Sequence, residues 1–265
     1  MSRASPAGPH HDGMIRKLLA TVVLAAALLV SSGHLVTAGP AGLDVLFIGN
    51  SLIGTPAVTG EDTPDVVRRL ATATGRVVRT TEVIRFGNTL QQTWDAGPAR
   101  AALTGRARYD YIVLQEYSTL VATGMRRAAA TLLRTYAPAL SGSLKPGGRV
   151  VLFKNWALAD PAPFRSRTAN VAAINAGYAR LAAVLPVPTV IAPVSDGFER
   201  VVARDGTAAL IVPDGKHPTG QAVYLDAATL YGVFFARSPR DLPDLYVPAA
   251  AAARLRDAAA TALDY

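Results

Sequence analysis

The sequence predicts a three-layer α/β/α domain with a mostly parallel sheet. Five short runs of apolar and β-branched residues are bounded by Gly, Pro or Asp, as strands are. These runs alternate with longer segments whose apolar residues recur at helical spacing. Most of these runs read as continuous apolar stretches, such as residues 45–48 and 111–114, which indicates strands that are buried on both faces of the sheet. Helices must then cover both faces.

The predicted strands cover residues 44–48, 77–84, 111–114, 149–153 and 187–192. The predicted helices cover residues 65–74, 97–103, 125–140, 168–185, 219–236 and 249–263. Pro248 directly precedes the last of these helices, a position where proline is tolerated. The chain contains no internal repeat and no linker-like stretch that would divide the domain.

The first 38 residues are expected to be a leader and signal peptide. Arg16 and Lys17 precede a run of thirteen residues, 18–30, that is apolar except for Thr21, and small residues follow up to Ala38. A run this short does not span a bilayer comfortably, so cleavage near Ala38 is favoured over the alternative, a retained N-terminal anchor. We therefore expect a secreted or extracytoplasmic protein whose single domain covers residues 39–265.

Composition excludes several classes of function. The chain has no cysteine, which rules out disulfides, thiolate metal sites and cysteine nucleophiles. The formal charge is +8, and +6 once the leader is removed, but the basic residues are scattered and form no patch with interleaved aromatic residues. We therefore expect no nucleic-acid partner. A loose association with anionic polymers of the cell envelope is compatible with this charge.

Ligands of such sheets bind beyond the carboxyl ends of the strands, so the residues there are the candidates for a site. Polar or glycine residues follow every predicted strand. They are found at 49–51, 85–89, 115–118, 155–156 and 195–196.

His217 is the candidate general base. The other three histidines lie in the predicted leader, so the domain keeps this one alone. Asp214 precedes it by three residues and can orient the imidazole and stabilise its protonated form. The alternative interpretation of this segment is a surface turn formed by Asp214 and Gly215.

Ser51 is the candidate nucleophile. It follows the first predicted strand directly, at the end of the sheet where sites form. Gly49 permits a sharp exit from the strand, and the amides after it can begin an anion-binding turn. The alternative is a serine that only caps a helix or a turn.

Two segments together resemble the SGNH (GDSL-type) hydrolase superfamily. The Gly-Asn-Ser-Leu segment at 49–52 is similar to its Gly-Asp-Ser-Leu block, and Asp214-x-x-His217-Pro218 is similar to its final block. The α/β-hydrolases also use the order Ser, Asp, His, but they need a G-x-S-x-G elbow and a separate acid, which this sequence lacks. The resemblance implies a flavodoxin-like α/β/α fold for residues 39–265 and a Ser51–Asp214–His217 triad.

The resemblance also implies an oxyanion hole. Its donors would be the backbone N–H groups of Ser51 and Gly87 and one side-chain amide. The third block contains Leu-Gln-Glu where the superfamily normally has Gly-x-Asn-Asp, so Gln115 is one candidate for that amide. Asn88, beside Gly87, is the other candidate. The Leu-Gln-Glu form is similar to subgroups that include carbohydrate acetylesterases.

Two weaker expectations concern the substrate pocket. Trp156 follows the fourth strand and is a candidate wall for an acyl or sugar group, although a packed tryptophan is an equal alternative. Glu116 is a second candidate there. Its alternatives are a role in orienting the loop beneath the nucleophile and, without any role in the site, an exposed acid. No cofactor is expected, and one histidine without cysteines makes a catalytic metal site improbable.

These residues predict a serine esterase that acts through an acyl-enzyme on small-molecule or carbohydrate esters, O-acetyl groups on carbohydrate among them. Two alternatives stay open: a lipase or phospholipase for longer acyl chains, and a non-catalytic carbohydrate-binding relic of the fold. The oligomeric state and the identity of the ester are not predicted.

Overall fold

Five parallel strands form the centre of the structure, in the order β2-β1-β3-β4-β5. The computed structural model describes residues 42–265. The strands are β1 (Leu43–Gly49), β2 (Val78–Ile84), β3 (Tyr109–Leu114), β4 (Leu144–Phe153) and β5 (Thr189–Ala192). The predicted three-layer α/β fold with a parallel sheet is confirmed.

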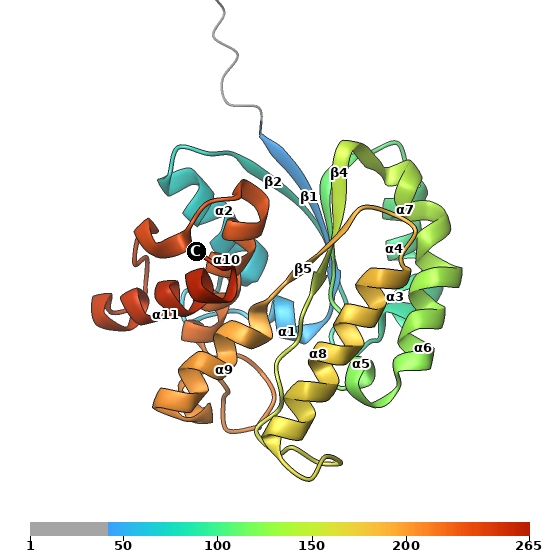
Figure 1. The fold of residues 1–265 in the computed structure, drawn as a ribbon. Helices are drawn as coiled ribbons and strands as arrows, with labels where there is room; N and C mark the ends of the chain where they lie inside the picture. Colours follow the sequence, from blue (N-terminus) through green and yellow to red (C-terminus); the bar gives the residue numbers. More distant parts are fainter. Residues whose placement is uncertain (1–41) are drawn as a thin grey trace, which may run out of the picture. The chain divides into compact units, whose positions relative to one another are not determined.

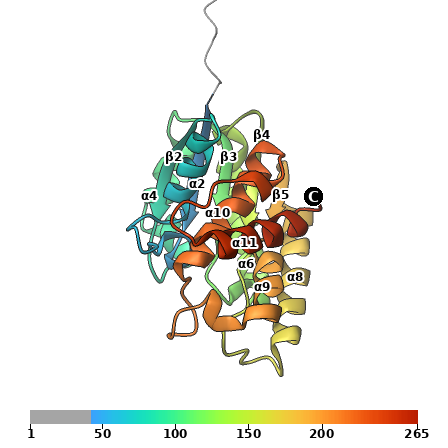
Figure 2. The same cartoon turned by 90° about the vertical axis from the view of Figure 1, so that its left-hand side faces the viewer.

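Helices cover both faces of this sheet, as Figure 1 shows with the sheet seen nearly edge-on. One layer contains α2 (Thr63–Ala73), α9 (Val194–Asp205), α10 (Gly220–Phe235) and α11 (Ala249–Ala262). The other contains α3 (Leu90–Asp95), α4 (Pro98–Thr104), α5 (Leu120–Thr123), α6 (Met125–Ala130), α7 (Ala137–Ser143) and α8 (Arg167–Val184). Figure 2 shows the first layer in front of the sheet.

Strand β1 explains why the sheet has a core on each face. Successive side chains of a strand point to opposite faces. Val45 and Phe47 belong to the core under α2 and α10, whereas Leu46 and Ile48 belong to the core under α4 and α8. All four are fully buried, so the apolar run of β1 is the sequence signature of a strand with helices on both sides.

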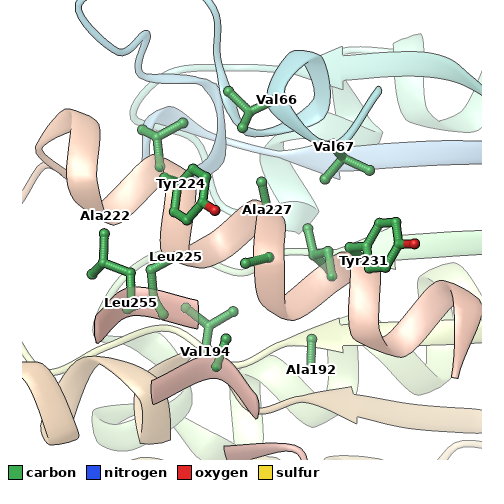
Figure 3. Close-up of a cluster of buried hydrophobic side chains, with 14 of the residues drawn as sticks. Val66, Val67, Ala192, Val194, Ala222, Tyr224, Leu225, Ala227, Tyr231 and Leu255 are labelled. Atoms are coloured by element: carbon green, nitrogen blue, oxygen red, sulfur yellow. The ribbon is translucent and has the colours of Figure 1, made fainter. Parts of the chain in front are cut away.

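The core under α10 is the larger of the two and is drawn in Figure 3. Tyr224 and Tyr231 on α10 lie toward Val66 and Val67 on α2, and Leu225 lies toward Val194 at the start of α9. Helix α10 is buried along nearly its whole length. It begins three residues after His217, so this packing anchors the chain that follows the candidate base.

The structure adds short helices that the periodicity did not predict. Helices α3 and α5 and α1 (Ser51–Gly54) have at most six residues, too few for a helical repeat of apolar positions. Helix α9 is longer, but it was not predicted, and residues 195–196 near its start were expected only as polar residues after a strand. The predicted helix at 125–140 is present as α6 and α7 joined by π-helical turns at Thr131–Tyr136.

The expected leader, signal peptide and cleavage point near Ala38 lie outside the described residues. Within residues 42–265, no helix combines the length and the apolar composition needed to cross a membrane.

Candidate active site

Ser51 begins α1 directly after β1, at the carboxyl end of that strand (Figure 1). Asn50 is the N-cap residue, and its side-chain oxygen accepts a hydrogen bond of 3.2 Å from the Leu52 N–H. The strand ends in Gly49 because a Cβ there would lie 2.8 Å from the Gln115 Oε1. This sharp turn leaves Ser51 only 4% exposed at the edge of the sheet.

Asp214 and His217 lie in the loop that leads into α10. The loop is closed by an antiparallel bridge between Ile211 and Pro218, and the Val212 N–H donates to the His217 carbonyl at 3.0 Å. Gly215 has a φ of +75°, a left-handed conformation that favours glycine. The Asp-Gly turn that was the alternative interpretation is therefore present, and it brings the two side chains together.

The three side chains form a continuous chain of hydrogen bonds. The His217 Nε2 lies 2.8 Å from the Ser51 Oγ, and the His217 Nδ1 lies 2.5 Å from the Asp214 Oδ2. The structure thus brings together residues 166 positions apart in the sequence. A nucleophile bonded to a base that a carboxylate orients is the arrangement of acyl-transfer enzymes.

Hydrogen bonding keeps Asp214 ionised. The bond to the His217 ring lowers the pKa of the Asp214 carboxyl to about 2, together with the N–H groups of His217 and Lys216. These two N–H groups donate to the Asp214 Oδ1 at 3.0 and 2.8 Å. A carboxylate that is charged across the neutral pH range can stabilise an imidazolium beside it.

Two backbone N–H groups beside the candidate nucleophile, at the carboxyl edge of the sheet, have no hydrogen-bond acceptor in the described residues. Within residues 42–265, neither the Ser51 N–H nor the Gly87 N–H donates to a protein acceptor. Gly87 has a φ of +78° in the turn after β2. That turn is tied to the nucleophile, because the Asn50 Nδ2 donates to the Asn88 carbonyl at 3.0 Å and the Arg85 N–H donates to the Gly49 carbonyl at 2.9 Å.

The structure does not leave the Gln115 amide free for the donor role that the sequence made it a candidate for. Its side chain is fully buried, and its Oε1 accepts the Asn50 N–H at 2.8 Å. Its Nε2 donates to the Asn155 Oδ1 at 3.2 Å and to the Glu116 carbonyl. Both hydrogens of the amide therefore have partners, and none is left for an oxyanion. Gln115 supports the turn before Ser51 from below.

Asn88 is the remaining candidate for the third donor. Its side-chain amide makes no hydrogen bond to the described part of the chain, and the residue is half-buried beside Gly87. Its backbone carbonyl is held by Asn50, which fixes where the side chain begins. Of the two amides expected from the sequence, only this one is available.

Glu116 and Trp156 are not exposed as pocket walls would be. Glu116 is 4% exposed, and its Oε1 accepts the N–H groups of Leu90 at 3.0 Å and Tyr117 at 2.7 Å. It therefore holds the loops after β2 and β3 together, and burial raises the pKa of its carboxyl. Trp156 is fully buried, and its Nε1–H donates to the Lys216 carbonyl at 3.2 Å.

Two asparagines among the residues after the strands build the site, in roles that the sequence did not predict. Asn50 both caps α1 and holds the turn after β2. Asn155 accepts from Gln115 and donates its Nδ2 to the Glu116 carbonyl at 2.7 Å. Asn50 directly follows β1 and Asn155 lies two residues beyond the end of β4, and that position was the signal available for them. In residues 42–265 no three His, Asp or Glu side chains gather in a group that could hold a metal ion.

Comparison with solved structures identifies proteins that share this fold. The chain is similar to the structure of a DUF4886 family protein from Bacteroides uniformis, with a TM-score of 0.68, 17% identity, and coverage of 85% of this chain and 96% of that one. It is similar to an acetylxylan esterase, Axe2, from Geobacillus stearothermophilus, with a TM-score of 0.58, 15% identity, and coverage of 74% and 96%. A protein from Slackia heliotrinireducens assigned to the SGNH hydrolases has a TM-score of 0.54, 24% identity, and coverage of 72% and 98%.

These likenesses show that the chain has the fold of SGNH hydrolases, and the expected resemblance is confirmed at the level of the fold. Esterases and lipases are among the structures that share it. No family model matches the chain, and no curated protein matches it.

Proposed function

We propose that this protein is a serine esterase with Ser51 as nucleophile, His217 as general base and Asp214 as the residue that orients the base. The observation that carries the proposal is the unbroken hydrogen-bonded chain Ser51–His217–Asp214. It lies at the carboxyl edge of the sheet, beside two free backbone donors.

The proposed reaction has two halves. His217 accepts the proton of the Ser51 hydroxyl while the oxygen attacks the ester carbonyl, and the N–H groups of Ser51 and Gly87 stabilise the oxyanion, with the Asn88 amide as third donor. His217 then gives the proton to the leaving alcohol, and an acyl-enzyme remains. Water, activated by the same imidazole, releases the acid and restores Ser51. These residues complete the cycle without a cofactor.

We further propose that the substrate carries a short acyl group, such as an O-acetyl group on a carbohydrate. A long acyl chain needs a contiguous apolar surface. Only six large apolar side chains are exposed in residues 42–265, and Phe86 alone among them adjoins the Gly87 turn in sequence. The fold is shared with an acetylxylan esterase, which adds support for this class of ester. Export through a signal peptide over residues 1–38 remains part of the proposal.

A fluorophosphonate probe tests the nucleophile. It should react with Ser51, and tandem mass spectrometry of the digested protein should place the adduct there. Ser51→Ala is the control and should take no label. An adduct on Ser118 or Ser195, which also follow strands, would overturn the assignment. A protein that takes no label and cleaves no ester would favour the non-catalytic relic.

A panel of p-nitrophenyl esters tests the acyl length. We expect kcat/KM to be highest for acetate and to fall as the acyl chain lengthens. A preference for octanoate or longer esters would favour the lipase alternative.

A further inference from the structure

The loop that carries Asp214 and His217 is folded largely on itself. Its internal bonds run from the Val212 N–H to the His217 carbonyl at 3.0 Å and from the Gly215 N–H to the Val212 carbonyl at 2.9 Å. Such local bonds set the position of Asp214 relative to His217. They do not set the distance from the imidazole to Ser51, which belongs to a distant part of the chain.

Two N–H groups from the segment after β4 hold this loop against the body of the domain. The Trp156 Nε1–H donates to the Lys216 carbonyl at 3.2 Å, and the Ala159 N–H donates to the Gly215 carbonyl at 2.9 Å. Both acceptors lie between Asp214 and His217 in the sequence. A third contact is weaker, because the Lys216 ammonium lies 4.9 Å from the centre of the Tyr117 ring at a half-exposed site.

Trp156 is itself rigidly placed. Its ring stacks on Phe198 of α9, with the ring centres 4.3 Å apart and the planes 3° from parallel. Phe153, at the end of β4, packs against it edge-on at 6.4 Å. The indole is fully buried, so its N–H points from a fixed support to the loop. Because this donor is held rigidly, its hydrogen bond fixes the loop, and with it His217, relative to the carboxyl edge of the sheet.

We propose that Trp156 is a positioning residue that sets the distance between His217 and Ser51 through its indole N–H, a role that rests on the proposed esterase function. Acyl transfer is sensitive to this distance, since a displacement of about 1 Å can cost roughly 10²-fold in rate. A tryptophan that only fills the core would contribute its ring and not its N–H. The two roles therefore separate when the N–H is removed and the aromatic packing is kept.

Trp156→Phe is that substitution, and Trp94→Phe is its matched control. The protein has two tryptophans, and Trp94 lies on α3 without a contact to the loop. We expect Trp156→Phe to lower kcat and the rate of fluorophosphonate labelling by roughly tenfold, with KM nearly unchanged. Trp94→Phe should retain the wild-type values. Equal activity of the wild type and Trp156→Phe would overturn the proposal.

Phe198→Leu distinguishes the aromatic packing beneath the Trp156 ring from the hydrogen bond that the Trp156 N–H donates. It keeps the N–H and removes the aromatic face beneath it, so we expect a larger fall in Tm than for Trp156→Phe and a smaller fall in kcat. If Phe198→Leu lowers kcat as much as Trp156→Phe does, Trp156 acts through packing alone and the proposal fails. Should Trp156→Phe not fold, a folded Phe198→Leu protein still tests the proposal, because a kcat near the wild-type value supports it and a fall of roughly tenfold or more overturns it.

A spectroscopic measurement separates this proposal from the proposed function. In protein labelled with ¹⁵N-histidine, the ring signals of His217 are assigned by their loss in His217→Ala. We expect Trp156→Phe to shift these signals and Trp94→Phe to leave them in place. This measurement does not depend on esterase activity. A wild type without such activity would contradict the proposed function but would leave the positioning role of Trp156 testable. If Trp156→Phe leaves the His217 signals unchanged while the wild type is labelled at Ser51, the positioning role of Trp156 is wrong and the proposed esterase function stands.

Discussion

The nucleophile and the base of the candidate site are held in different ways. Ser51 is 4% exposed and is held over a buried set of amides in which Gln115 connects the ends of β1, β3 and β4. The side chains of Asp214 and His217 are 47% and 30% exposed, in a loop closed mainly by its own backbone bonds. The nucleophile is thus fixed by the sheet as a whole, and the base lies in a local turn that two N–H groups from the segment after β4 hold against the domain.

This difference predicts how the two regions respond to substitution. Removing a group from the buried amides leaves polar atoms without partners and weakens the whole domain. Removing a side chain from the exposed loop costs the fold little, because water replaces the lost contacts. Damage to activity and damage to stability should therefore separate between the two regions.

The largest effect on activity is expected from His217→Ala. The substitution removes the base, so kcat should fall by about three orders of magnitude or more. The loop is exposed, so the Tm should change by only a few degrees. Steady-state kinetics and thermal unfolding measure the two quantities. A variant that keeps a tenth of the wild-type kcat would contradict the assignment of the base.

Asn88→Ala should have the next largest effect. It removes the free amide beside Gly87 and should lower kcat by about 10²-fold with little change in KM, as the loss of one oxyanion donor does. Stability should be nearly unchanged, because the side chain makes no hydrogen bond to the described residues. Full activity in Asn88→Ala would leave the oxyanion to the backbone donors.

Gln115→Ala should show the opposite pattern. It leaves the Asn50 N–H and the Asn155 Oδ1 unpaired in the interior, so we expect the free energy of unfolding to fall by roughly 2–4 kcal/mol. Urea denaturation measures this loss. If Gln115→Ala is as stable as the wild type but loses 10²-fold in kcat, the side chain acts as an oxyanion donor after all, and the comparison between the two regions breaks down.

Asp226→Asn should have the smallest effect, at a buried site that belongs to neither region. Asp226 is fully buried on α10, where it faces Thr63 of α2 without a hydrogen bond of normal geometry. Burial raises the pKa of Asp226 well above its ordinary value. The folded protein therefore keeps a proton that the unfolded chain releases above about pH 4, and its stability falls as the pH rises from there.

Asparagine cannot ionise, so Asp226→Asn should be more stable than the wild type at pH 8, by on the order of 1 kcal/mol. The difference should shrink as the pH falls to about 4 and below, where the aspartate of the unfolded chain takes up its proton as well. Denaturation at both pH values measures it, and kcat should stay at the wild-type value. A stability difference that does not depend on pH would show that Asp226 is ionised in the folded protein.

The sequence by itself determined the order of the strands along the chain and singled out the candidate base. The apolar runs place β1 and β3 within two residues of their observed starts, because the buried second half of each strand leaves no room for polar side chains. His217 needed no structure, since the domain contains no other histidine. The structure also has Ser51 after an apolar strand, as the sequence predicted, and Asp214 hydrogen-bonded to His217 three residues away.

The tertiary structure decided what the amides and the tryptophan do. The type of residue shows that Gln115 can donate, but only the fold shows that Asn155, 40 residues away, accepts the bond. Trp156 follows a strand as a pocket residue would, yet its ring is covered by Phe198 and its N–H meets the loop 60 residues further on. Hydrogen bonds act over about 3 Å, and strands far apart in the sequence meet at that range only when the sheet is assembled.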